Sequence, residues 1–193
     1  MTRDEAYGIV TGLIKNHNLI KHHLAAESAM KGIAAFLKDK TGDQSINIED
    51  WGLVGLLHDA DYEICKGHPE KHTLILEEKI GNQLPPHILY AIKSHAYKYN
   101  ERGVEPKSLM DWAIYTCDEL TGFIIATALV KPDKKLSSVD TDSVLRKMKD
   151  PSFARAVDRG QIQLCEDKLQ IPLRVYVEIV LSSMKGISNE LGL

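Results

Sequence analysis

The feature of this sequence that could support chemistry is a histidine followed directly by an aspartate, His58-Asp59, in a chain of 193 residues with eight histidines. The pair closes the apolar segment WGLVGLL, whose two glycines allow a helix to pack closely against a neighbour. An ionised carboxylate beside an imidazole is costly to bury unless a cation compensates for its charge. We therefore expect His58 and Asp59 to bind a divalent metal ion.

Two further segments give this pair a context. His22 lies in LIKHHLAAESAM, the pair lies in GLLHDADYE, and Asp118 lies in YTCDELTGF. Over roughly residues 18–125 the sequence thereby resembles the HD superfamily of metal-dependent phosphohydrolases, which has a histidine on an early helix, the HD pair, and an aspartate on a later long helix. The alanine-rich spacing after the first ligand favours His22 over its neighbour His23. The resemblance implies that His22, His58, Asp59 and Asp118 hold a metal ion.

Family members with two metal ions have two more histidines between the HD pair and the last aspartate. His72 in GHPEKHT and His95 in IKSHAYK occupy these places, while His68 precedes Pro69 and is expected in a loop. The resemblance then implies a second ion held by His72 and His95, with Asp59 as the bridge. Mixed imidazole and carboxylate ligands suit iron, manganese, cobalt, nickel or zinc, so we expect one or two such ions per chain.

Two such ions would lower the pKa of a bound water and give a hydroxide that attacks a phosphorus atom. The resemblance therefore implies hydrolysis of a phosphomonoester or phosphodiester, with His58 and Asp59 as catalytic residues. The expected substrate is small, phosphorylated and nucleotide-like. Two alternatives stay open, namely an HD-type di-iron oxygenase with the same ligands and a non-catalytic metal-binding regulatory module.

Several other polar residues have both a functional and a structural interpretation. Asp61 could orient a metal-bound imidazole or cap the next helical turn. Lys93 and Lys98 flank His95 and could contact a substrate phosphate, although exposed lysines are common on helices. In small bacterial HD hydrolases a C-terminal helical segment covers the site. Lys134, Lys135, Arg155 and Arg159 resemble positions in those hydrolases, so the resemblance adds them to Lys93 and Lys98 as candidate phosphate-binding residues.

The remaining histidines and the large apolar residues are expected to have no part in catalysis. Isolated histidines are more often exposed or part of the core than metal ligands. We expect structural or solvent-exposed roles for His17, His23, His68 and His87, and core positions for Trp51, Trp112, Cys117 and Phe123.

The elements that must position the candidate ligands are predicted to be helical. Apolar residues recur at helical spacing, and no segment alternates in the way typical of strands. Asn47 is expected to cap the helix that leads to the HD pair, and Pro132 to end the helix that carries Asp118. We expect helices at about 7–14, 19–38, 48–57, 70–80, 87–97, 107–130, 140–149, 151–169 and 172–185. The sequence thus predicts an all-α HD-domain helical bundle, a single domain over 1–193 with a core at about 18–125 and a C-terminal helical extension at about 131–193.

Composition and charge favour a small-molecule substrate in a reducing compartment. The net charge of −3 offers no basic excess for a nucleic-acid partner. The three cysteines are odd in number and widely spaced, which argues against a disulfide framework. The N-terminal segment MTRDEAYGIV lacks the apolar region of a secretory signal, and no apolar run is long enough for a membrane span. We therefore expect a cytoplasmic protein without a membrane partner, and the sequence does not indicate its oligomeric state.

Overall fold

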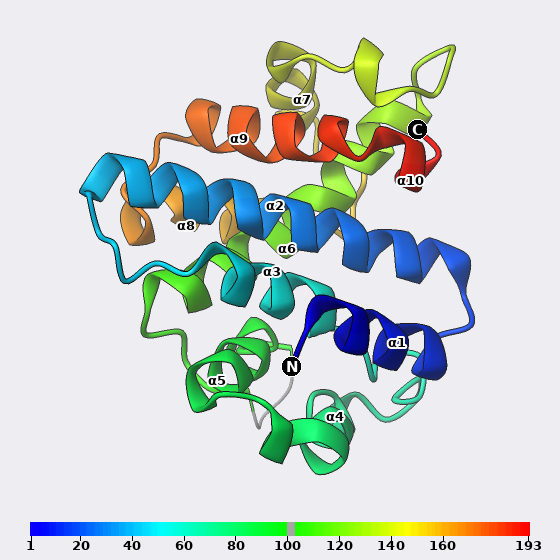
Figure 1. Ribbon diagram of the computed structural model, residues 1–193. Coiled ribbons are helices and arrows are strands. Elements are labelled where there is room, and N and C mark those ends of the chain that lie inside the picture. Colours follow the sequence, from blue (N-terminus) through cyan, green and yellow to red (C-terminus); the bar gives the residue numbers. More distant parts are fainter. Residues whose placement is uncertain (100–102) are drawn as a thin grey trace.

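A computed structural model describes residues 1–99 and 103–193, and each element in these ranges is a helix (Figure 1). The all-α prediction is confirmed for this part of the chain. The α-helices are α1 (Arg3–Leu13), α2 (His17–Thr41), α3 (Ile48–Leu57), α4 (Leu74–Ile80), α5 (Pro86–His95), α6 (Leu109–Leu129), α7 (Thr141–Met148), α8 (Arg159–Lys168), α9 (Leu173–Gly186) and α10 (Ser188–Leu191). Three short 3-10 helices are η1 (Pro69–Lys71), η2 (Gly81–Gln83) and η3 (Leu136–Ser138).

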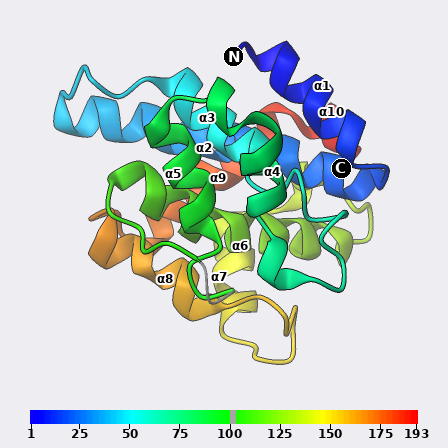
Figure 2. The same cartoon turned by 90° about the horizontal axis from the view of Figure 1, so that it is seen from below.

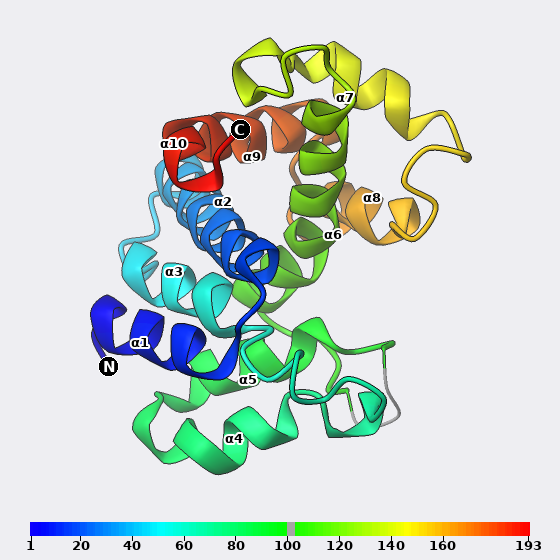
Figure 3. The same cartoon turned by 90° about the vertical axis from the view of Figure 1, so that its right-hand side faces the viewer.

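Helix α2 is the longest element and packs against α3, α6 and α9 (Figures 1 and 3). The side chain of Asn16 caps its start by accepting a hydrogen bond from the amide of Asn18, and Gly42 ends it in the left-handed conformation, with φ of 70°. α4 and α5 lie on the side of α3 away from α9, and Figure 2 shows them from that side. The helix that carries His22 therefore packs against α3, which leads to His58, and against α6, which carries Asp118, while α5 packs against α3 and α6.

The contact between α2 and α3 depends on Gly55. A Cβ atom at Gly55 would lie 2.4 Å from the carbonyl oxygen of Ala26 in α2, closer than two such atoms can approach. At Gly52 a Cβ would meet only the flexible side chain of Lys31. The expectation that glycine allows close packing before His58 is thus confirmed at Gly55, where the backbones of the two helices meet.

The apolar core extends from α1 to the C-terminal helices. It includes Val10 of α1, Met30 of α2 and Val180 of α9 in one cluster of buried residues. Of the residues expected in the core, Trp51, Phe123 and Cys117 are buried, whereas Trp112 is only partly buried against it. Among the described helices, none combines the length and the apolar character needed to cross a membrane.

The helix predicted at 70–80 is interrupted, and this prediction is wrong in its first half. Residues Pro69–Lys71 form the 3-10 helix η1, His72 leaves helical geometry with φ of −58° and ψ of 136°, and α4 begins only at Leu74. Thr73 lies between them in the left-handed region, with φ of 69°. A carboxylate from outside the segment, that of Asp61, accepts hydrogen bonds at this break and stabilises it.

The helix predicted at 151–169 is also shorter than expected, because residues 151–157 form turns and α8 spans only Arg159–Lys168. The side chain of Asp158 caps α8 by accepting a hydrogen bond from the amide of Gln161. The guanidinium of Arg159 donates to backbone carbonyl groups of the turns, which a continuous helix would have satisfied internally. Those acceptors are the carbonyls of Met148, Asp150, Ala154 and Val157, together with that of Phe153.

Candidate metal centre

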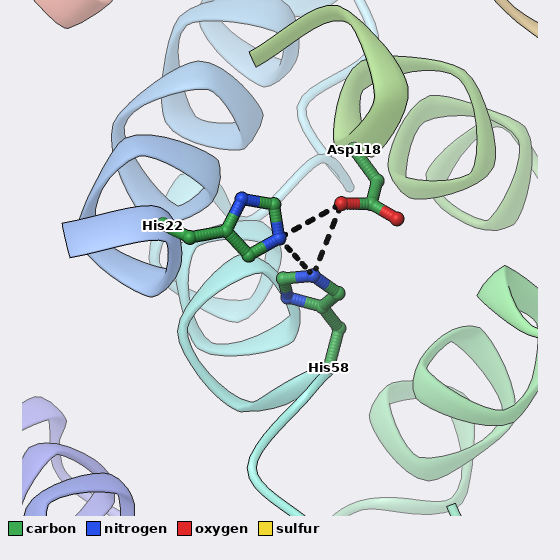
Figure 4. A group of neighbouring side chains, drawn as sticks. All are labelled: His22, His58 and Asp118. Carbon is green, nitrogen blue, oxygen red and sulfur yellow. Dashed lines mark hydrogen bonds and ion pairs between the residues drawn. The ribbon is translucent and has the colours of Figure 1, made fainter. Parts of the chain in front are cut away.

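Three side chains from three helices converge on one point of the interior (Figure 4). His22 comes from α2, His58 directly follows α3, and Asp118 comes from α6. The Nε2 atoms of the two histidines lie 3.2 Å apart, and Oδ1 of Asp118 lies 2.9 Å from Nε2 of His22 and 3.4 Å from Nε2 of His58. We call these residues the first group.

A second group consists of Asp59, His72 and His95. Oδ1 of Asp59 lies 3.2 Å from Nε2 of His72 and 3.1 Å from Nε2 of His95. The two Nε2 atoms lie 3.0 Å apart. His95 is the last residue of α5, whereas His72 lies at the break before α4 and not on a helix as predicted.

The carboxylate of Asp59 lies between the two groups. Its Oδ1 faces His72 and His95, and its Oδ2 lies 3.6 Å from Nε2 of His22 and 3.7 Å from Nε2 of His58. Each oxygen of this one carboxylate therefore faces a different group. The structure thus brings together the six residues predicted as metal ligands, in two neighbouring sets of three.

Hydrogen bonds fix the orientation of three of the four imidazoles. Nδ1 of His58 donates to the carbonyl of Gly55 at 2.8 Å, and Nδ1 of His95 donates to a carbonyl one turn back in α5. Nδ1 of His72 donates to Oδ1 of Asp61 at 2.8 Å. A carbonyl or carboxylate oxygen can only accept, so the proton of each neutral ring is on Nδ1. The lone pair of Nε2 in His58, His72 and His95 is therefore directed at its group, as metal binding requires.

The charges of the carboxylates and imidazoles are strongly coupled. Burial would raise the pKa values of Asp59 and Asp118, but the charge of His58 and the hydrogen bonds from the surrounding imidazoles hold both pKa values well below the ordinary range. Burial opposes protonation of His22, yet Asp118 raises its pKa to about 9. Both carboxylates are therefore ionised.

In the second group, the pKa values of the two imidazoles shift in opposite directions. Burial is again the largest effect on His72, but hydrogen bonds with Asp59 and Asp61 outweigh it and raise its pKa to about 9. For His95 burial prevails over the hydrogen bond with Asp59 and lowers the pKa. Partly buried carboxylates that need positive charge, beside imidazole nitrogens, form a donor set that fits a divalent transition-metal ion.

The four other histidines lie outside both groups, in keeping with the roles expected for them. His23 is fully buried, its Nδ1 donates to the carbonyl of Leu56, and burial lowers its pKa to about 3. Its Nε2 is buried and has no hydrogen-bond partner among the described residues. The other three are exposed: His17 at the start of α2, His68 beside Glu70, and His87 beside Asp50.

A third group of potential metal ligands, Asp61, Cys65 and His72, is better explained by hydrogen bonding. The Asp61 carboxylate already accepts from Nδ1 of His72 and from the backbone amides of Thr73 and Leu76. Burial raises the pKa of the Cys65 thiol to about 11, so the thiolate that a metal needs is disfavoured. Asp61 thus contributes to the second group by holding the imidazole of His72 in place through a hydrogen bond.

A cavity of about 490 Å³ opens beside the metal-ligand candidates, five of which line it. Sequence analysis missed most of the other lining residues. Glu119 follows Asp118 and could have been suspected, and burial together with the charge of Asp118 raises its pKa to about 7. The contributions from α8 could not be predicted, because they depend on where that helix packs. The polar and aromatic lining residues missed in this way are Tyr62, Tyr99, Tyr115, Glu119, Asp158 and Gln161.

One of the four candidate phosphate-binding lysines lies at the cavity. Lys98 lines it, whereas Lys93 forms an ion pair with Glu77 at 2.7 Å and does not. Lys134 and Lys135 lie in the turn after α6 and do not line the cavity either. Of the two C-terminal arginines, Arg155 is exposed and Arg159 is bound to backbone carbonyls, so Lys98 alone of the six candidates lines the cavity.

The two groups and the cavity form a single centre, built by α2, α3, α5, α6 and the break before α4. Its buried histidines and aspartates could hold a metal ion. Comparisons of the chain with protein-family models, with curated proteins and with solved structures found no match.

Proposed function

We propose that the protein is a metal-dependent phosphohydrolase that acts on a small, nucleotide-like phosphomonoester or phosphodiester. The observation that carries the proposal is the carboxylate of Asp59, whose two oxygens face two groups of imidazole and carboxylate ligands. The resemblance of the sequence to the HD phosphohydrolases supports the same conclusion. His22, His58 and Asp118 would hold one ion and His72 and His95 another, with Asp59 shared between them.

Bound divalent ions supply two things to phosphoester hydrolysis, since they acidify a coordinated water and draw electrons from the phosphoryl oxygens. The protein's own residues position the reactants. The Nδ1 hydrogen bonds of His58, His72 and His95 hold these rings in place. Because the six candidate ligands lie on packed helices and on the turns directly beside them, the phosphoryl group would meet a preformed site.

The cavity indicates where the substrate would lie. The phosphoryl group would lie next to Asp59, in the cavity that Lys98 also lines. Its organic part would lie against Tyr115 and against Asp158 and Gln161 at the start of α8. An aromatic ring with hydrogen-bonding groups beside it suits a substrate that has hydroxyl or amide groups, as a nucleoside has.

The experiment that tests the function is a phosphate-release assay in the absence of oxygen. The protein is reconstituted with Mn²⁺ or Co²⁺ and given p-nitrophenyl phosphate, its diester, nucleoside monophosphates and cyclic nucleotides. We expect turnover of at least one ester and its loss in Asp59→Asn. His87→Ala, which changes an exposed histidine outside both groups, is the matched control and should retain activity.

The same assay, run beside an oxygen-electrode measurement in air on the iron-loaded protein, separates this proposal from its alternatives. The protein would be an oxygenase if it consumed oxygen in proportion to product, required iron to do so, and released no phosphate. Stoichiometric metal binding with no turnover of any ester, in air or without it, would favour the regulatory module. Failure to bind any transition-metal ion would reject all three readings of the centre.

A further inference from the structure

Asp61 is a fully buried carboxylate that lies behind the second group. Its Oδ1 accepts hydrogen bonds from Nδ1 of His72 at 2.8 Å and from the backbone amide of Thr73 at 3.1 Å. Its Oδ2 accepts from the backbone amide of Leu76 at 2.9 Å. One side chain thus binds both an imidazole of the metal centre and the start of α4.

The backbone at this point needs such support. Thr73 is a buried, β-branched residue with φ of 69°, a conformation that such residues rarely adopt. Its own side chain does not cap α4, and the amides of Thr73 and Leu76 bond to Asp61. Because Thr73 directly follows His72, the hydrogen bonds that fix this break also fix the backbone that carries the imidazole.

The geometry places Asp59 and Asp61 in complementary positions. Both lie in the turn after α3, but Asp59 faces Nε2 of His72 at 3.2 Å whereas Asp61 binds Nδ1 of the same ring. The ring is therefore held between two carboxylates, with its proton directed to Asp61. None of the first group is bound by Asp61, because His22 and Asp118 come from α2 and α6 and Nδ1 of His58 bonds to the carbonyl of Gly55 in α3.

We propose that Asp61 is a positioning residue that sets the metal occupancy of the second group alone. It holds His72 in the tautomer and orientation in which Nε2 faces Asp59 and His95. This inference rests on the proposed metal binding at the centre. Binding of the second ion would then depend on an intact start of α4, while binding of the first ion would depend on the packing of α2, α3 and α6.

The test is Co²⁺ binding to Asp61→Asn, measured by calorimetry and by metal analysis after gel filtration. The asparagine amide retains the shape, but it loses the charge and turns an N–H group toward one of the three donors. We expect the affinity of the second ion to fall roughly 10- to 100-fold, while the first ion is retained. His72→Ala should lose the same ion, and adding Asp61→Asn to it should cause no further loss.

Asp111→Asn is the matched control. Asp111 is also a buried aspartate that accepts two backbone hydrogen bonds at a helix start, from Lys107 and Ser108, but it lies outside both metal-ligand groups. It should lower stability and leave both ions bound. If Asp61→Asn binds both ions as the wild type does, or if Asp111→Asn loses the second ion equally, the positioning role is wrong.

A second readout does not need a metal ion or the variant. In the metal-free wild type, nitrogen chemical shifts should identify His72 as the Nδ1–H tautomer or as the doubly protonated ring, with an Nδ1 proton that exchanges slowly with water. A proton on Nε2 alone would overturn the inference. Absence of Co²⁺ binding to the wild type would instead reject the proposed function, and the tautomer measurement would still decide the link between Asp61 and His72.

Discussion

Nε2 of His22 lies 3.2 Å from Nε2 of His58, and Oδ1 of Asp118 lies within 3.4 Å of both. Nδ1 of His58 is committed to the carbonyl of Gly55, so in the neutral ring Nε2 presents a lone pair to His22. Two imidazoles and a carboxylate that converge in this way need a proton or a metal ion between them. A metal ion would therefore compete with a proton for these three ligand atoms, and the first prediction follows from that competition.

Divalent transition-metal ions should raise the melting temperature of the protein. A ligand at 100 times its Kd stabilises the folded state by about 2.7 kcal/mol, provided that the unfolded chain does not bind it. For a chain of this size that corresponds to about 5–11 °C. Differential scanning calorimetry with Mn²⁺, Co²⁺ or Zn²⁺, before and after a chelator, measures the shift. Ca²⁺, which prefers oxygen ligands, is the control, and an equal shift with Ca²⁺ would contradict a nitrogen-rich site.

The two groups should lose metal separately when their own ligands are removed. His22→Ala should chiefly release the ion of the first group and His95→Ala that of the second, whereas Asp59→Ala should weaken both because its carboxylate faces both. Metal analysis of each variant gives the stoichiometry. His87→Ala should bind as the wild type does, and a loss of metal in this control would show that the ligand assignment is wrong.

Lys98→Ala should raise KM for the phosphorylated substrate. Lys98 is exposed and lines the cavity, so its contribution is limited by solvent screening. We expect an increase in KM of about tenfold or less, equivalent to about 1.4 kcal/mol at most. Lys93→Ala is the matched control, since Lys93 is paired with Glu77 away from the cavity. Equal effects of both variants would show that Lys98 does not contact the phosphate.

Cys165 should resist alkylation in the folded protein. It is fully buried in α8, and burial raises the pKa of its thiol to about 12, so the reactive thiolate is scarce at pH 8. In the unfolded chain this thiol ionises near its ordinary pKa of 9, so the folded state binds more protons and stability should fall as pH rises above about 9. Mass spectrometry after iodoacetamide at pH 8 should find Cys165 modified only in denaturant, and rapid modification of the native protein would contradict this.

The helices and the ligand set were accessible from the sequence because both depend on local patterns. Apolar spacing located α1, α2 and α6 to within a few residues, and the capping role of Asn47 is confirmed by its hydrogen bond with the amide of Glu49. The resemblance to the HD family named six ligands, and the structure brings all six together.

The errors concern features that depend on contacts between distant residues. The helix expected at 70–80 breaks because Asp61, eleven residues before His72, accepts the hydrogen bonds at the break. The carbonyls of Ala154 and Val157 in the turns before α8 accept hydrogen bonds from the side chain of Arg159, and a helical pattern could not predict these contacts. Spacing alone could not assign Lys134 or Lys135 to the cavity or exclude them, since their distance from it depends on the turn after α6.

The close contact at Gly55 has a consequence for ion selectivity. Gly55 lies three residues before His58, and its hydrogen atom occupies the place where a methyl group would collide with the backbone of Ala26. A larger residue would move α3 away from α2 and separate His58 from His22, so the pair would accommodate a larger ionic radius. In the proposed metal centre, the spacing of the two helices would in this way set the preference among divalent ions, and a graded series of side chains at Gly55 would test it.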